Sequence, residues 1–182
     1  QELVECLNNV NSKLAVTFDG VCEKVNNSIK KHNDTSENKI EQVIKVSPQD
    51  SLPLPIATIM NINDKLHKNN SPIKEIEIPY KEFLKKGKDV LDFDPVKFDA
   101  DDTAVIVYTG GTTGTPKGVE LTNKNFNAVV QGYKNSKIDF NKGDSFLHFL
   151  PPWTAYGMVI YYLLYQMGVK CIFIPKLDPA TY

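Results

Sequence analysis

The chain has few cysteines, almost no net charge and no long uninterrupted apolar run. Its three cysteines, Cys6, Cys22 and Cys171, lie far apart and belong to no Cys-x-x-Cys or Cys/His cluster. This spacing argues against a structural zinc site. We expect reduced, buried thiols in a cytoplasmic protein.

The charge and hydropathy patterns exclude two further classes. Twenty-one Lys and Arg residues face 22 Asp and Glu residues, for a net charge of -1, which argues against nucleic acid as the main partner. The most apolar stretch, residues 158–174, is interrupted by Gln166, Gly168 and Lys170 and is too short to span a bilayer. A buried helix that leads into a buried strand fits this stretch better. An apolar content of 41% is sufficient for a sizeable core.

Hydrophobic periodicity predicts an α/β fold with mostly parallel sheets flanked by helices. Residues 1–46 alternate between helical and strand patterns, which is typical of parallel strands joined by crossover helices. Prolines punctuate residues 47–79, where we expect mostly loop with a weak helix at Ile59–Leu66. We predict two lobes, residues 1–89 and 90–182. The predicted helices are 1–9, 20–31, 79–87, 123–134 and 157–167, and the predicted strands are 13–19, 41–46, 103–108, 145–151 and 169–175. Of the strands, 13–19, 103–108 and 169–175 are expected to be buried.

The stretch "VYTGGTTGTPKGVELT", residues 107–122, holds four glycines and four threonines within ten residues. Glycines let backbone N–H groups converge on an anion, and the N-terminus of a following helix would add partial positive charge. Lys117 would add a full charge. A nucleoside triphosphate is the ligand that this combination favours. The order Pro116-Lys117-Gly118 excludes a Walker A loop, and no Gly-x-Gly-x-x-Gly follows a strand.

This stretch closely resembles the phosphate-loop signature of the adenylate-forming (AMP-binding) superfamily. The first eleven positions of "YTGGTTGTPKGV" follow the pattern Tyr-Thr-Ser/Gly-Gly-Ser/Thr-Thr-Gly-x-Pro-Lys-Gly, with "DADDTAVIV" before and "ELTNKNF" after. That superfamily includes acyl-CoA synthetases, peptide-synthetase adenylation domains and luciferases. Gly110 stands where many members have Ser, which favours a long-chain fatty acid–CoA ligase. The resemblance implies Rossmann-like lobes of one larger N-terminal domain.

The resemblance also implies which residues of the loop, 109–118, hold the β- and γ-phosphates of ATP. Thr109 is in addition a candidate ligand of Mg²⁺. The loop would close on ATP and loosen as pyrophosphate leaves. The residues implied are Thr109, Gly110, Gly111, Thr112, Thr113, Gly114 and Lys117.

A second stretch, "FLHFLPPWTAYGM", resembles the family's next motif, Pro-x-aromatic-His-x-x-Gly, near the acyl pocket. Trp153 is the aromatic residue, and Thr154 stands at the usual His position, so no role of that His carries over. Trp153, Thr154, Tyr156 and Gly157 are therefore candidates for the substrate pocket. A core position for the two aromatic side chains is an equally open alternative.

The implied reaction joins a fatty or related acid to coenzyme A with ATP, by way of an acyl-adenylate. The family's later motifs, including a catalytic Lys in a C-terminal domain, do not occur in these 182 residues. We therefore expect an internal fragment with no catalytic residue of its own, inactive alone. Two alternatives stay open: a peptide-synthetase-type adenylation domain, and a degenerate nucleotide-binding module that serves interaction.

Two histidines and an acidic cluster complete the candidates. His32 lies in a polar stretch and is expected to be exposed, whereas His148 alternates along a strand and is expected to face one side of it. Asp99, Asp101 and Asp102 are expected to form a solvated turn rather than an acid/base pair.

Overall fold

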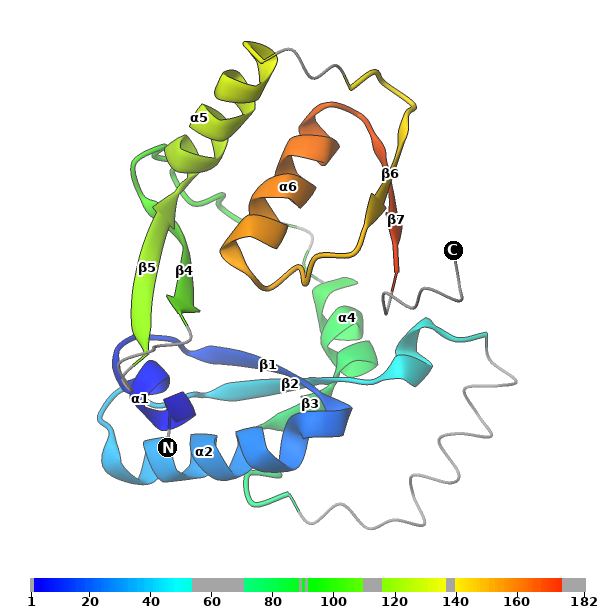
Figure 1. The fold of residues 1–182 in the computed structure, drawn as a ribbon. Coiled ribbons are helices and arrows are strands. Elements are labelled where there is room, and N and C mark those ends of the chain that lie inside the picture. Colours follow the sequence, from blue (N-terminus) through cyan, green and yellow to red (C-terminus); the bar gives the residue numbers. More distant parts are fainter. Residues whose placement is uncertain are drawn as a thin grey trace. The chain divides into compact units, whose positions relative to one another are not determined.

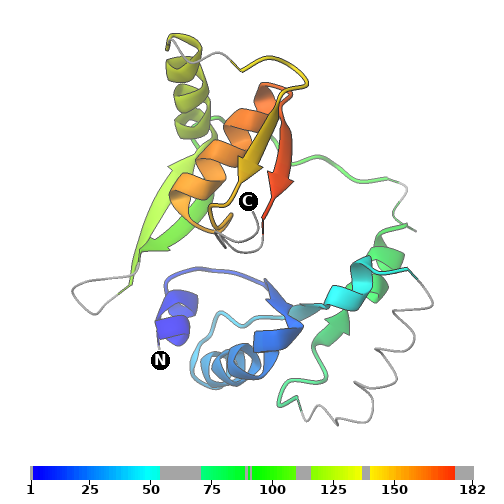
Figure 2. The ribbon, with the colours of Figure 1, turned by 45° about the vertical axis from the view of Figure 1, so that its right-hand side comes forward.

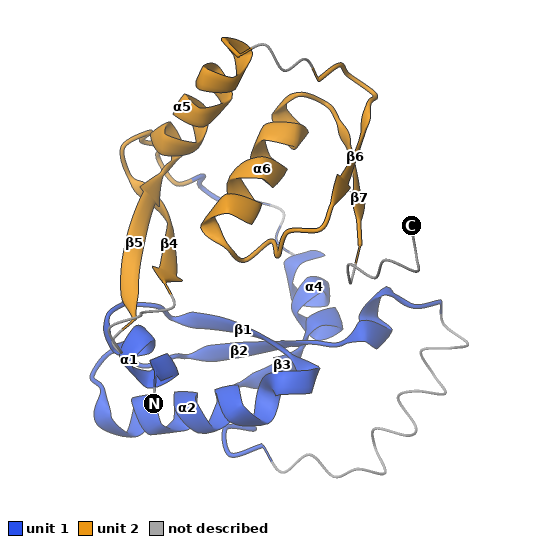
Figure 3. Ribbon diagram, viewed as in Figure 1, with its two compact units in different colours: residues 1–95 blue, residues 96–182 orange. Residues whose placement is uncertain are grey.

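The computed structural model describes residues 2–53, 71–88, 90, 92–109, 116–136 and 140–174. The chain divides into two compact units, residues 1–95 and 96–182 (Figure 3). The unit boundary follows Pro95, whereas the sequence placed the lobe boundary after Asp89. The predicted helix at Ile59–Leu66 lies outside the described residues.

The first unit is a parallel three-stranded sheet in the order β1-β2-β3, with helices on both faces (Figure 1). Strand β3 and the two short 3-10 helices were not predicted, because each is brief and two of them contain a proline. The elements are α1 (Glu2–Asn8), β1 (Leu14–Phe18), η1 (Asp19–Val21), α2 (Cys22–Thr35), β2 (Gln42–Val46), η2 (Pro48–Ser51), β3 (Glu77–Pro79) and α4 (Tyr80–Lys88).

Helix α2 packs on one face of this sheet and forms the core. Ile29 is 1% exposed and Val43 of β2 is 0% exposed, and Ala15 of β1 packs against the same cluster. Because successive strand residues point to opposite faces, Leu14, Val16 and Phe18 face away from α2. These three are 43%, 63% and 50% exposed, so β1 is not the fully buried strand that the sequence predicted.

The second unit contains an antiparallel hairpin and a parallel β-α-β unit (Figure 2). The fold class is therefore confirmed as α/β with mostly parallel strand pairs, and the hairpin is the one antiparallel pair among the described strands. Strand β5 was not predicted. The elements are β4 (Thr103–Thr109), β5 (Lys117–Thr122), α5 (Asn123–Lys134), β6 (Ser145–His148), α6 (Ala155–Gln166) and β7 (Lys170–Phe173).

Two of the predicted buried elements in this unit are only partly buried in the described structure. Strand β4 has no buried residue, and its Ile106 is 38% exposed. Helix α6 buries Leu163 and Leu164, whereas Tyr165 is 71% exposed. Only one side of each element therefore faces the core of its unit.

Both described histidines are buried, and His32 corrects the expectation of exposure. His32 is 1% exposed, and its two ring nitrogens lie 2.7 Å from Asn8 Oδ1 and from the Asn38 carbonyl oxygen. His148 is also 1% exposed and lies among rings of its unit, 5.2 Å from Phe173 between centroids. Neither His148 nitrogen has a hydrogen-bond partner among the described residues.

Candidate functional site

The Gly/Thr loop is carried at the tip of the β4–β5 hairpin. Thr109, the last residue of β4, pairs with Lys117, the first residue of β5, so the strands meet directly at the two ends of residues 110–116. The Thr109 hydroxyl also donates a long hydrogen bond of 3.4 Å to the Lys117 carbonyl oxygen. The hairpin thus holds the two ends of the loop, Thr109 and Lys117, side by side.

The register places the side chains of Thr109 and Lys117 on the same face of the hairpin. Residues directly opposite each other in an antiparallel pair have Cβ atoms about 4.5–5.5 Å apart. Both residues are exposed. The Lys117 ammonium group makes no ion pair within the described part of the chain. A hydroxyl and an available cation therefore lie side by side at one end of the loop, an arrangement suited to an oxyanion.

Five of the seven predicted phosphate-binding residues lie outside the described residues, so their geometry stays a prediction. They are Gly110, Gly111, Thr112, Thr113 and Gly114.

The N-terminus of the helix that follows the loop lies at the opposite end of the hairpin from Lys117, contrary to the expectation that it would add positive charge to the loop. Helix α5 begins at Asn123, and its N-cap Thr122 pairs with Thr103 at the opposite end of the hairpin from Lys117. Strand β5 intervenes, and six extended residues span about 20 Å. The effect of a helix dipole falls off within its first turn, so Lys117 is the source of positive charge that the described residues provide near the loop.

Thr122 caps the N-terminus of α5. Its hydroxyl accepts a hydrogen bond from the Asn125 amide at 3.2 Å, and the Asn125 side chain accepts one from the Thr122 amide at 2.8 Å. Lys124 then forms an ion pair of 3.0 Å with Asp101, in the exposed turn before β4. The turn at residues 99–102 is therefore joined to the start of α5 by this ion pair, at the base of the hairpin.

The second candidate motif forms the start of α6, with Thr154 as its N-cap. The Thr154 hydroxyl donates to the Pro151 carbonyl oxygen at 2.9 Å and accepts from the Gly157 amide at 3.1 Å. Gly157 is buried, and a Cβ atom there would lie 2.1 Å from the Pro151 carbonyl oxygen. This turn therefore needs a hydroxyl at residue 154 and no side chain at residue 157.

The capped turn leaves the two aromatic candidates in solvent. Trp153 is 73% exposed and Tyr156 is 66% exposed, so neither is a core aromatic of its unit in the described structure. Their assignment to an acyl pocket stays a prediction.

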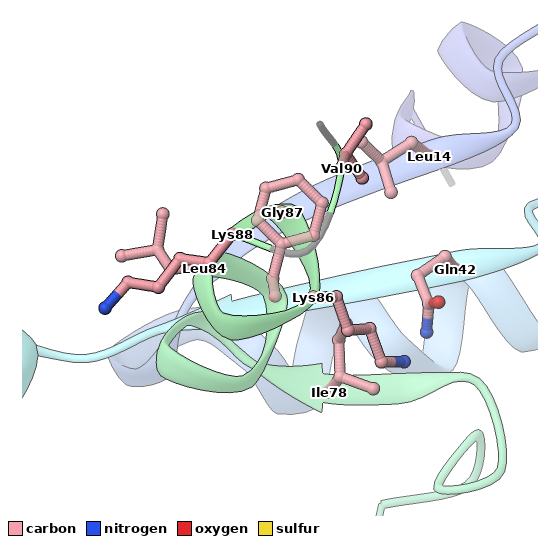
Figure 4. A pocket seen from close by; sticks show the side chains of 9 residues that line it. Leu14, Gln42, Ile78, Leu84, Lys86, Gly87, Lys88 and Val90 are labelled. Carbon is pink, nitrogen blue, oxygen red and sulfur yellow. The ribbon is translucent and has the colours of Figure 1, made fainter. Parts of the chain in front are cut away.

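A separate groove of about 640 Å³ lies in the first unit, between α4 and the sheet face that α2 leaves uncovered (Figure 4). Leu14, Ile78 and Val90 line it, together with Leu84 of α4. Of its polar side chains, which are Gln42, Lys86 and Lys88, Gln42 already donates a hydrogen bond to the Ile76 carbonyl oxygen at 2.8 Å. The groove contains none of the predicted site residues and no convergent set of catalytic groups.

The described residues contain no group of three or more His, Cys, Asp or Glu side chains that could hold a metal ion. None of the helices in the described ranges is long and apolar enough to cross a membrane.

The fold places the chain among α/β proteins with parallel sheets, and comparison with protein families is more specific. The family described as AMP-binding enzyme matches residues 1–182. The chain therefore belongs to the AMP-binding enzyme family, as its phosphate-loop signature predicted.

Known proteins similar to the chain are ligases and a luciferase. A chloroplastic long-chain-fatty-acid–[acyl-carrier-protein] ligase of Arabidopsis thaliana is 43% identical over 72 residues, which are 40% of this chain and 10% of the relative. A long-chain-fatty-acid–CoA ligase of Bacillus subtilis is 32% identical over 145 residues, 77% of this chain and 26% of the relative. A red-emitting luciferase from Phrixothrix hirtus has the same fold, with a TM-score of 0.64 and 22% identity over 97% of this chain and 30% of its own. The chain thus spans a tenth to about a quarter of the length of these curated relatives.

Proposed function

We propose that this chain is the phosphate-loop part of an AMP-forming carboxylate–CoA ligase that acts on a fatty or related acid. The observation that carries the proposal is the Thr109–Lys117 pair, which presents a hydroxyl, and an ammonium group with no ion pair among the described residues, at the two ends of the Gly/Thr loop. The membership in the AMP-binding enzyme family supports ATP as the ligand of that loop. The ligases among the relatives support the carboxylate as its co-substrate.

The proposed reaction has two steps. A carboxylate oxygen attacks the α-phosphorus of ATP, which breaks the bond to the β-phosphate and releases pyrophosphate. The thiol of coenzyme A then attacks the acyl carbonyl carbon of the adenylate, loses its proton and expels AMP. Lys117 would hold the β- and γ-phosphates during the first step and would neutralise charge on the departing pyrophosphate.

Magnesium would enter with the triphosphate and neutralise part of its charge. The Thr109 hydroxyl oxygen is a hard donor on the same face as Lys117, and it would be the protein-side ligand of the ion. Its hydrogen bond to the Lys117 carbonyl uses the hydroxyl proton and leaves the oxygen lone pairs available.

The test is carboxylate-dependent exchange between ATP and labelled pyrophosphate. We propose that the relatives' greater length reflects parts that this chain lacks, so the 182-residue chain alone should catalyse no exchange and the complete polypeptide that carries it should. Lys117→Gln in the complete polypeptide should lower the exchange rate by about 100-fold, because a charged contact to the leaving group is lost. Lys134→Gln, at the end of α5, is the matched control and should leave the rate unchanged. Exchange by the 182-residue chain would refute its dependence on missing parts, and full activity of Lys117→Gln would refute the proposed site.

The thiol acceptor is the second question, because the Arabidopsis relative is named for an acyl-carrier protein. Coenzyme A and a phosphopantetheinylated carrier protein should be offered in parallel, with AMP release as the common readout. We expect coenzyme A to be the better acceptor. Preference for the carrier protein would instead support an adenylation domain that loads carrier proteins. Nucleotide binding without exchange would support the interaction module.

A further inference from the structure

Gly118, the second residue of β5, lies under two side chains from β4. It pairs with Tyr108, and a Cβ atom added to Gly118 would be 2.9 Å from Ile106 Cγ2 and 3.5 Å from two carbons of the Tyr108 ring. A glycine inside a strand often marks a place where another group approaches closely. Here Ile106 occupies the space that a Cβ atom at position 118 would need, and the Tyr108 ring packs at contact distance beside it.

The strand alternation separates this contact from the ligand side of the hairpin. Gly118 points to the face that carries Ile106 and Tyr108, whereas Lys117 points to the face that carries Thr109. The ring of Tyr108 therefore lies behind the backbone that bears Lys117 and not beside its ammonium group.

We propose that Ile106 and Tyr108 are positioning residues: by closing over Gly118, they fix the course of β5 at Lys117 and so the place of its ammonium group at the end of the Gly/Thr loop. This inference rests on the proposed function for its effect on ATP. It assigns a role to the face of the hairpin opposite Thr109 and Lys117.

Because the hairpin is largely exposed, a substitution at Gly118 should change the position of Lys117 more than the stability of the unit. Ile106 is 38% exposed and Val119 is 42% exposed, so these strands bury little apolar surface on which the stability of the unit could depend. A methyl group at Gly118 should therefore push β5 away from β4 locally and leave the unit folded.

The first test is Gly118→Ala in the complete polypeptide, measured by carboxylate-dependent ATP–pyrophosphate exchange. The KM for MgATP should rise by about tenfold, because a displaced cation binds the triphosphate less well, and the KM for the carboxylate should change by less than about twofold. Gly132→Ala is the matched control, since nothing lies within 4 Å of a Cβ atom at that helical position. Equal changes in both KM values, or no difference from Gly132→Ala, would overturn the proposal.

The second test is rescue, which a general loss of stability would not show. Ile106→Ala removes the atom nearest to the new methyl group, so the double variant Ile106→Ala/Gly118→Ala should recover the KM for MgATP to within about twofold of the single Ile106→Ala variant. Tyr108→Phe keeps the ring and should keep the KM, whereas Tyr108→Ala should raise it. A double variant as impaired as Gly118→Ala would show that the steric contact is not the cause.

Hydrogen exchange without ligand separates this inference from the proposed function. In the complete polypeptide, Gly118→Ala should speed amide exchange in peptides around residues 116–120 and leave the base of the hairpin unchanged, and the double variant should restore it. If the wild-type protein shows no ATP–pyrophosphate exchange, the proposed function fails. The amide-exchange measurement still tests whether the contact of Ile106 and Tyr108 with Gly118 fixes the course of β5. Unchanged amide exchange in Gly118→Ala would refute it.

Discussion

The Thr154 hydroxyl accepts a hydrogen bond from the Gly157 amide at 3.1 Å and thereby begins helix α6. Many family members have His at the position of Thr154. In this chain the residue is a helix cap, with its proton donated to the Pro151 carbonyl oxygen. The residue that departs from the family motif therefore has a local structural role in this chain.

Replacement of Thr154 by Val should destabilise the protein by about 1 kcal/mol, because the isosteric side chain cannot cap the helix. Thr154→Ser should retain the cap and the stability. The free energy of unfolding from urea titrations measures both. Thr35→Val is the control: the Thr35 hydroxyl bonds to the Lys31 carbonyl oxygen at the end of α2 and caps no helix N-terminus. Equal stabilities of Thr154→Val and Thr154→Ser would contradict the capping role.

The two buried histidines should respond in opposite directions to replacement by Phe. His32→Phe removes the two hydrogen bonds that the buried ring makes with Asn8 and with the Asn38 carbonyl oxygen, at a cost of about 1–3 kcal/mol. His148→Phe removes two ring nitrogens that have no partner among the described residues and keeps a ring against Phe173, so it should stabilise by about 1 kcal/mol.

Urea unfolding of the two histidine variants, compared with the wild type, measures both free energies. Destabilisation by His148→Phe of the same size as that by His32→Phe would show that His148 has a polar partner in the complete protein.

The Cys22 thiol should make stability fall at alkaline pH. Burial raises the pKa of Cys22 above its ordinary value, the nearby Asp19 carboxylate raises it further, and Lys45 opposes the shift. A pKa raised in the folded state contributes stability that is complete below about pH 8.5, the ordinary pKa, and is lost as the pH rises through the folded pKa. The urea midpoint of the wild type should therefore fall more steeply between pH 8 and pH 10 than that of Cys22→Ala. Parallel pH profiles would contradict the prediction.

Periodicity predicted most elements, because apolar residues at helical or alternating spacing reflect the face that each element buries. Periodicity also indicates that His32 is buried, although His32 was expected to be exposed. Cys22, Asn26 and Ile29 are buried along α2, and His32 lies three residues further on the same face. The polar neighbours of His32 concealed this stripe.

Strand β5 was missed because the glycine-rich loop was expected to lead directly into a helix. Val119 and Leu121 alternate with polar residues, a strand signal that the lysine and glycine before them obscured. The exposure of β1 and β4 could not be predicted from the sequence for another reason. An apolar strand pattern shows which side chains could be buried, but not whether another element packs on them.

A loop held at the tip of a hairpin has a consequence for the order of folding. Strands β4 and β5 pair across a short stretch of chain, whereas the whole of α6 lies between β6 and β7 in the sequence. Contacts that are local in sequence form fastest. We therefore expect the hairpin to assemble early, so that the frame of the loop exists before the parallel strands of its unit have joined.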